Sequence, residues 1–251
     1  MHTPSWIELD EMVNVRDVGG LPTRNGHRTR SGVLLRGEHP DDLGGSGVKH
    51  LVEVLGLKLV VDLRMAPERE GRGSPLLDAG VEILAFPMWE DPRTTDAMVT
   101  TLSEDEGARV MGEFYVHVLD HFQERAGQVL ERIVHGGVPT YVHCAAGKDR
   151  TGMVVAMLLG AADVEPESIV ADYAATEIRL KELLARLSRT LDPKDAATAS
   201  TYPKYTTRAH PDSMRYVLNT LTDRHGTLRE WWRAGGVDDA MLDEWYHLIV
   251  E

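Results

Sequence analysis

The sequence predicts an α/β fold, with a four- or five-stranded, mostly parallel sheet flanked by helices and a helical C-terminal extension. Three observations support this class: short stretches rich in β-branched residues, helical apolar patterns between them, and Gly or Pro at their boundaries. Strands that alternate with helices are typical of a largely parallel sheet. No internal repeat or linker composition divides the chain, so we expect residues 1–251 to form one domain.

Strand-like stretches precede and separate the helical patterns of the first 150 residues. The expected strands lie at 33–35, 59–63, 81–86 and 140–143. Apolar residues at helical spacing over 48–55, closed by Gly56, predict a helix before the second strand. Residues 104–135 are rich in helix formers, with a break expected near Gly127. Gly136 and Gly137 are expected to end this helix before the fourth strand.

The chain after Gly152 is expected to be helical almost throughout. The expected helices lie at 153–162, from Pro166 onward, at 176–189, 214–224 and 237–250. Residues 191–211 contain three prolines and are expected to be a loop. We therefore interpret 163–251 as a helical extension that could act as a lid.

Composition and charge limit the classes of partner. Hydrophobic residues at 42% and charged residues at 27% are ordinary for a globular protein. A net charge of −13 repels nucleic acid and anionic membrane surfaces, so no nucleic-acid partner is expected and any anion site must be built locally. The apolar run 153–162 is shorter than the ~18 residues of a membrane span, so no stable membrane insertion is expected. Residues 1–6 lack the pattern of a signal peptide, which favours a cytoplasmic protein, although a leader removed earlier is compatible with the sequence.

Cys144 is the single cysteine of the chain, which rules out an internal disulfide framework and a Cys-rich metal site. An isolated cysteine of this kind is a candidate nucleophile, and the alternative is a buried, inert thiol. It opens the segment Cys144-Ala145-Ala146-Gly147-Lys148-Asp149-Arg150-Thr151, between a predicted strand and a predicted helix. Such a turn directs successive backbone N–H groups into one concavity, and the helix dipole adds positive potential. The sequence therefore predicts an anion site formed by residues 144–150.

The residue types in this segment indicate phosphoryl transfer. Ala145, Ala146 and Gly147 are small enough for the backbone to approach a phosphate. The N–H groups and Arg150 favour the thiolate of Cys144, and the planar guanidinium suits two phosphate oxygens at once. Thr151 could hydrogen-bond the sulfur as it departs. Together they predict a cysteinyl-phosphate intermediate that water then hydrolyses, with no metal or organic cofactor.

Other cysteine or phosphate sites fit the segment less well. A nucleotide-binding G-x-x-x-x-G-K-[ST] loop requires Ser or Thr where Asp149 stands and Gly where Val142 stands. A sulfurtransferase does not account for Arg150 and Thr151, and an arsenate reductase usually needs further cysteines. A non-catalytic module that binds phosphate remains an alternative.

The segment from His143 to Gly152 resembles the signature of the protein tyrosine phosphatase superfamily, and it is particularly similar to that of the bacterial PtpB-type tyrosine and phosphoinositide phosphatases. Residues 14–20, 61–64 and 170–173 resemble further motifs of that family. The resemblance spans nearly the whole chain. It implies a cysteine phosphatase fold and hydrolysis of phosphotyrosine, with phosphoserine, phosphothreonine or phosphoinositides as further substrates.

The resemblance also implies a general acid on a neighbouring loop, after a strand and a proline. Asp91 fits this description, with Glu90 as the alternative, and Asp149 inside the loop is a further candidate for acting on the proton. Lys148 resembles the lysine that meets an additional ring phosphate in members that accept phosphoinositides. A phosphorylated protein and a phosphoinositide therefore both remain candidate substrates, and the oligomeric state stays open.

Side chains outside the loop are expected to have structural roles. Asp62 with Arg64, and Arg16 with Asp17, are expected to form ion pairs. His143 is expected to orient the loop through hydrogen bonds. His117 and His121 lie at metal-ligand spacing on a predicted helix, but no Glu-rich motif accompanies them, so a solvated or packed face is expected instead.

Overall fold

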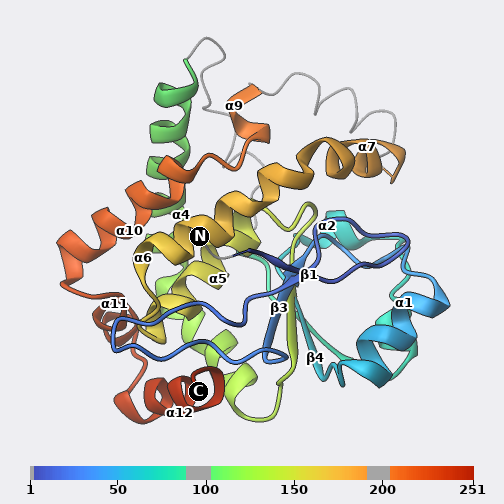
Figure 1. Cartoon of the computed structure of the whole chain (residues 1–251), viewed down its shortest axis with the longest axis horizontal. Helices are drawn as coiled ribbons and strands as arrows, with labels where there is room; N and C mark the ends of the chain where they lie inside the picture. Colours follow the sequence, from blue (N-terminus) through green and yellow to red (C-terminus); the bar gives the residue numbers. More distant parts are fainter. Residues whose placement is uncertain (1–2, 89–102, 191–203) are drawn as a thin grey trace.

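The computed structural model describes residues 3–88, 103–190 and 204–251 and contains a six-stranded, mostly parallel sheet with helices on both faces (Figure 1). The strands are β1 (Ser5–Trp6), β2 (Arg16–Asp17), β3 (Leu34–Gly37), β4 (Leu59–Asp62), β5 (Glu82–Ala85) and β6 (Thr140–His143). They follow the order β1-β2-β3-β6-β4-β5. Neighbours from β3 to β5 are parallel, and β1 and β2 are antiparallel additions at one edge. The predicted fold class is confirmed. The sequence patterns missed the two-residue strands β1 and β2 and the short helices at 66–69, 75–78, 204–207 and 228–234, of which the one at 204–207 lies within the expected loop 191–211.

The helices divide between the two faces of the sheet. The first face carries α1 (Gly45–Lys49), the π-type turn η1 (His50–Val54), α2 (Ala66–Arg69) and α3 (Pro75–Asp78). The other face carries α4 (Glu104–Val134), α5 (Asp149–Ala161) and α6 (Pro166–Ala174). The 3-10 turn η3 (Ala175–Arg179), α7 (Leu180–Thr190), α9 (Lys204–Thr207), α10 (Pro211–His225), α11 (Leu228–Ala234) and α12 (Asp239–Ile249) complete the described chain. The extension is helical as predicted, whereas its role as a lid and the single-domain assignment stay predictions.

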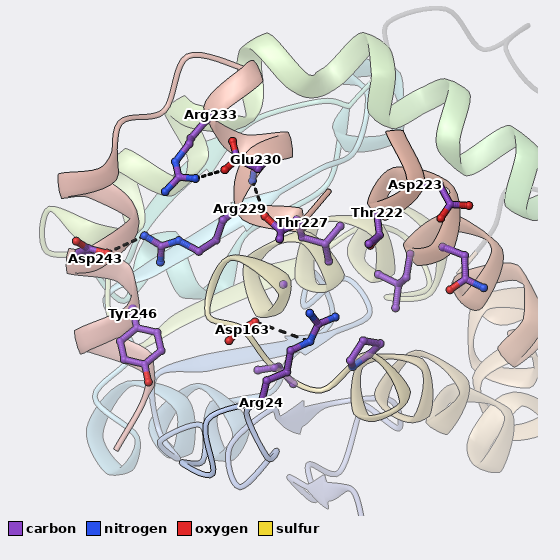
Figure 2. A pocket seen from close by; sticks show the side chains of 16 residues that line it. Arg24, Asp163, Thr222, Asp223, Thr227, Arg229, Glu230, Arg233, Asp243 and Tyr246 are labelled. Atoms are coloured by element: carbon purple, nitrogen blue, oxygen red, sulfur yellow. Dashed lines mark hydrogen bonds and ion pairs between the residues drawn. The ribbon is translucent and has the colours of Figure 1, made fainter. Parts of the chain in front are cut away.

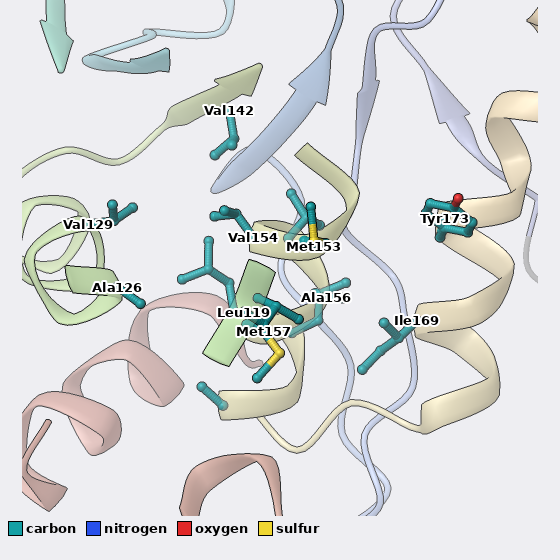
Figure 3. Packing of buried hydrophobic residues seen from close by; sticks show 14 of the residues in the cluster. Leu119, Ala126, Val129, Val142, Met153, Val154, Ala156, Met157, Ile169 and Tyr173 are labelled. Carbon is teal, nitrogen blue, oxygen red and sulfur yellow. The ribbon is translucent and has the colours of Figure 1, made fainter. Parts of the chain in front are cut away.

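Alternation along the strands places one core on each face. Leu59, Val61 and Val142 belong to the larger cluster with α4 and α5, whereas Val60 and Tyr141 belong to the smaller cluster beneath α1 and α3. Figure 3 shows Val142 facing side chains of α4 and α5. Both layers are apolar, so β6 and the part of α5 from Thr151 to Ala161 are buried.

The long helix α4 runs without a break, contrary to the kink expected near Gly127. It begins at Ser103, whose hydroxyl accepts from the Glu106 N–H while the Glu106 carboxylate accepts from the Ser103 N–H. A Cβ at Gly127 would lie 3.0 Å from the Val237 side chain, so the glycine provides space for the segment before α12. Packing therefore accounts for this glycine, and the helix continues through it.

Tryptophans fix the C-terminal helices to α5. The indole N–H of Trp232 donates to the Met157 carbonyl at 2.9 Å, and that of Trp245 donates to the Leu158 carbonyl at 2.8 Å. Both side chains are buried, as is Trp231. Among the described residues no helix combines the length and the apolar character that a membrane crossing requires.

Candidate active site

The segment 144–148 leaves the central strand β6 and leads directly into α5. Paired register places His143 beside Gly37 of β3 and Asp62 of β4, so the loops after all three strands meet at one edge of the sheet. Cys144 is 2% exposed. Gly147 has φ +69°, and a Cβ there would lie 2.2 Å from the backbone carbonyl of Gly37. Only glycine fits this position, because both the conformation and the close approach exclude a side chain.

The carbonyl oxygens of the loop are held from outside. The His39 N–H donates to the Ala145 oxygen at 3.1 Å, and the Asn14 amide donates to the Ala146 oxygen at 3.0 Å. The guanidinium of Arg36 donates to the Gly147 oxygen at 2.8 Å. Because the N–H and C=O of a peptide unit point in opposite directions, these contacts favour N–H groups directed toward the centre of the loop.

The N-terminus of α5 completes the site. Its first turn contributes positive potential from the helix dipole and the side chains of Arg150 and Thr151. Thr151 is fully buried, and its hydroxyl oxygen has no hydrogen-bond partner within the described part of the chain. A buried hydroxyl costs free energy unless it is paired. The Thr151 hydroxyl is therefore suited to bond either an oxygen that arrives with the substrate or the Cys144 sulfur when it carries a negative charge.

Glu68 of α2 orients Arg150 through a two-point ion pair. The two terminal nitrogens of Arg150 lie 2.5 and 2.7 Å from the two carboxylate oxygens of Glu68. Burial raises the pKa of Glu68, but the hydrogen bonds and charge of Arg150 outweigh burial and lower it. Sequence reasoning missed Glu68, since its contact with Arg150 spans 82 positions.

Asp149 lies at the centre of a polar cluster beside the loop. Its Oδ1 accepts a short hydrogen bond from the Tyr115 hydroxyl and lies 3.0 Å from the Lys148 ammonium. The hydroxyls of Tyr115 and Tyr173 are 2.9 Å apart. Burial and the nearby Asp149 charge raise the pKa of Tyr115, so this residue is a neutral donor to the carboxylate.

Lys148 contacts the C-terminal extension. Its ammonium donates to the backbone oxygens of Thr206 at 2.5 Å and Arg208 at 3.0 Å. The side chain is 5% exposed. These bonds connect residues 144–150, the phosphate loop, to the C-terminal end of α9 and to Arg208, which follows it.

The candidate acids Asp91 and Glu90 lie outside the described residues. The strand β5 and the residues Phe86 and Pro87 that lead toward them are described, and Phe86 is buried against Phe122 of α4.

The other predicted site residues lie together at the N-terminal end of α5. They are Ala145, Ala146 and Gly147 and the side chains of Cys144, Lys148, Asp149, Arg150 and Thr151.

A buried charge network lies behind the loop. Arg64 pairs with Asp62 at 2.8 Å, as predicted, and also with Asp41 at 2.6 Å. The ring of His143 lies 3.0 Å from the Cys144 oxygen through Nδ1 and 3.8 Å from Asp62 through Nε2. These contacts support the predicted role of His143 in orienting the loop.

The expected pair between Arg16 and Asp17 is wrong. Successive residues of a strand point to opposite faces of the sheet, so the two side chains separate. Arg16 pairs with Asp172 at 2.8 Å, whereas the Asp17 carboxylate accepts from the N–H groups of Gly19 and Gly32.

His117 and His121 pack against each other on α4, with ring centroids 4.4 Å apart. Within the described residues, no group of three or more His, Cys, Asp or Glu side chains is arranged to hold a metal ion.

A cavity of about 610 Å³ lies at the opposite end of α5 (Figure 2). Gly160, Asp163 and residues of α10, α11 and α12 line it. Arg229 pairs there with Asp243, and Arg233 pairs with Glu230. None of the residues of the phosphate loop reaches this cavity.

A mostly parallel sheet whose central strand ends in a Cys-x5-Arg loop before a buried helix defines the class of cysteine-dependent phosphatases. The family model described as the tyrosine phosphatase family matches residues 7–251, and the chain belongs to this family. The triple specificity protein phosphatase PtpB of Mycobacterium tuberculosis is 29% identical over 94% of this chain and 96% of its own length. A Cupriavidus necator protein of the tyrosine-protein phosphatase type is 31% identical over 69% of this chain, and the match spans 63% of that relative. The core catalytic domain of the PP-IP phosphatase SIW14 from S. cerevisiae, solved with citrate, has a TM-score of 0.37 at 16% identity and covers 72% of this chain and 93% of its own.

Proposed function

We propose that the chain hydrolyses phosphomonoesters, with phosphotyrosine as the preferred substrate and Cys144 as the nucleophile. The observation that carries this proposal is the outward anchoring of three consecutive loop carbonyls around a buried cysteine, with Arg150 held beside it. N–H groups and a guanidinium that are fixed before the reaction stabilise the charge of a transferring phosphoryl group without reorganisation.

The proposed reaction has two steps. In the first, the Cys144 sulfur attacks phosphorus, the P–S bond forms, and the bond from phosphorus to the leaving oxygen breaks as an acid supplies a proton. In the second, water attacks phosphorus and gives a proton to the base that the acid of the first step has become, the P–S bond breaks, and inorganic phosphate and the thiolate are released. Arg150 would hold two phosphate oxygens in both steps. Asp91, Glu90 and Asp149 stay the candidates for the proton transfers.

The environment of Lys148 favours a protein substrate over a phosphoinositide. Its ammonium has three close acceptors: the oxygens of Thr206 and Arg208 and the Asp149 carboxylate. To reach an additional ring phosphate, Lys148 would have to leave these acceptors. A phosphorylated protein partner and a cytoplasmic location stay predictions.

Release of phosphate from a panel of substrates tests the proposal. The full chain would be given a phosphotyrosine peptide, the matching phosphoserine and phosphothreonine peptides, and a soluble phosphoinositide, with orthovanadate as the inhibitor control. We expect the fastest release from phosphotyrosine and inhibition by vanadate. Faster release from the phosphoinositide would identify a lipid phosphatase instead. Binding of the phosphotyrosine peptide without phosphate release at any pH would indicate a non-catalytic module.

A further inference from the structure

We infer that Asp172 of α6 is a positioning residue for the phosphate loop, acting through Arg16, Arg36 and Asn14 to hold two loop carbonyls away from the substrate. The inference rests on the proposed phosphatase function. None of these four side chains lies within the Cys144–Arg150 segment, and they come from three separate parts of the chain.

The Asp172 carboxylate divides between two arginines. Its Oδ1 accepts from Nε of Arg16 at 2.8 Å, and its Oδ2 accepts from a terminal nitrogen of Arg36 at 2.6 Å. The backbone oxygen of Asp172 accepts a further bond from Arg16 at 2.7 Å. Both arginines are fully buried and Asp172 is 9% exposed, so water competes little for these contacts.

Arg36 connects Asp172 directly to the loop. Its second terminal nitrogen donates to the Gly147 oxygen at 2.8 Å and lies 3.5 Å from the Lys148 oxygen. A planar guanidinium fixed at one nitrogen by Asp172 has little freedom at the other. The Gly147 carbonyl therefore points toward Arg36.

Arg16 connects Asp172 to the loop indirectly, through the side chain of Asn14. A terminal nitrogen of Arg16 donates to the Asn14 side-chain oxygen at 2.8 Å. Since an arginine can only donate, the amide oxygen must face it, and the NH₂ group of Asn14 then faces the Ala146 oxygen at 3.0 Å. Arg16, held by Asp172, thus orients the amide of Asn14 toward the loop, and the Thr176 hydroxyl lies 3.4 Å from the same amide oxygen.

The cost of burial favours a positioning role over a stabilising one. A buried ion pair is weak support for stability, because apolar side chains of similar size often fold as well. Here two arginines are buried with two carboxylates, Asp172 and Glu38, and Glu38 accepts from the N–H groups of Val13 and Asn14 at 2.6 and 2.9 Å. This cluster places two hydrogen-bond donors, Asn14 and Arg36, at the carbonyl oxygens of two successive loop residues, Ala146 and Gly147.

The test compares Asp172→Asn with Asp17→Asn in the full chain. Both substitutions neutralise a carboxylate in the same part of the molecule. Among the described residues, however, the Asp17 carboxylate accepts only from the N–H groups of Gly19 and Gly32 and has no bond to the loop. The two readouts are kcat for p-nitrophenyl phosphate and the affinity for tungstate, a phosphate-like oxyanion that is not turned over. We expect Asp172→Asn to lower both by about 30- to 100-fold, the scale of a displacement of about 1 Å at a reacting centre. Asp17→Asn should leave both within about threefold while lowering the melting temperature.

Asn14→Ala provides the second variant, since it removes one donor without leaving a buried charge. We expect it to weaken tungstate binding and kcat by about tenfold. The double variant with Asp172→Asn should lose less than the product of the two single effects, because Asp172 acts partly through Asn14. If Asp172→Asn does not fold, the tungstate affinity and kcat of Asn14→Ala alone test the inference.

Tungstate affinity and kcat within threefold of the wild type in Asn14→Ala, or in a folded Asp172→Asn, would overturn the inference. Absence of turnover by the wild type would contradict the proposed function instead. In that case the tungstate affinities of the same variants still test the positioning role, because binding of the oxyanion does not depend on turnover.

Discussion

The guanidinium of Arg150 and the carboxylate of Glu68 face each other in a two-point ion pair, with nitrogen–oxygen distances of 2.5 and 2.7 Å. The two residues follow neighbouring strands, β6 and β4, and meet at the carboxyl edge of the sheet. A bidentate pair fixes the plane of a guanidinium as well as its position. Arg150 is therefore oriented before a phosphate arrives.

Glu68→Gln should lower kcat by about 10- to 100-fold, because Arg150 would keep its charge but lose the fixed plane that matches the phosphate oxygens. Steady-state kinetics with p-nitrophenyl phosphate measures this effect. Glu167→Gln is the matched control, since Glu167 forms a two-point pair with Arg215 at 2.8 and 2.9 Å on the exposed surface. Equal kcat values for the two variants would contradict the role given to Glu68.

Tyr115→Phe should alter the pH dependence of kcat/KM. The substitution removes the hydroxyl that donates to Asp149, while the aromatic ring and its packing against Tyr173 are retained. If Asp149 takes part in proton transfer, one limb of the pH profile should move and kcat should fall about tenfold. Tyr246→Phe, which removes a hydroxyl bonded to Asn25, should leave the profile unchanged. Superimposable profiles for Tyr115→Phe and the wild type would exclude this use of Asp149.

Lys148→Met should loosen the attachment between the phosphate loop and the segment Lys204–Ala209. The variant keeps the apolar stem but cannot bond the oxygens of Thr206 and Arg208. Hydrogen exchange of backbone amides in this segment should accelerate by about tenfold or more. Lys49→Met, at an exposed pair with Glu53, is the control. Unchanged exchange would show that the lysine does not hold the segment.

The stability of the fold should fall as the pH decreases from about 6.5 to 4. Burial, together with the charge of Arg64, lowers the pKa of His143 to about 4, against the opposing effect of Asp62. Between this value and the ordinary value of 6.5 the unfolded chain binds a proton that the folded chain excludes. The free energy of unfolding should therefore decrease by up to about 1.4 kcal/mol per pH unit in this window.

Denaturant unfolding of the wild type and of His143→Gln, measured across this pH range, isolates the contribution of His143. The carboxylates Asp62 and Glu68 have pKa values lowered by their partners from the ordinary values of 3.8 and 4.5. The stability that they contribute is therefore lost mainly below those values, at more acidic pH than the contribution of His143. An identical pH slope for the variant would refute the assignment to His143.

Local sequence patterns predicted the parallel strands and the phosphate loop, because both depend on contiguous residues. The segment from Cys144 to Thr151 contains its own small residues, nucleophile and arginine. The helix expected at 153–162 is present as α5, which begins earlier, at Asp149. The short strands β1 and β2 were missed, since two residues are too few to show an alternating pattern.

Contacts between distant segments could not be predicted from spacing. Arg16 was expected to pair with its neighbour Asp17, yet its partner Asp172 lies 156 positions away. Glu68 and Tyr115 also reach the loop only because the sheet and α4 bring them there. Their residue types are common on helices, and nothing in the sequence around them distinguishes a surface carboxylate or core tyrosine from a residue that orients the site.

Cys144 is the proposed nucleophile, so the turnover of Cys144→Ser is the decisive measurement. We expect this variant to bind the phosphotyrosine peptide but to hydrolyse p-nitrophenyl phosphate at least about 10⁴-fold more slowly than the wild type. Orthovanadate should inhibit the wild type under the same conditions. Turnover by Cys144→Ser within tenfold of the wild-type rate would contradict the covalent mechanism.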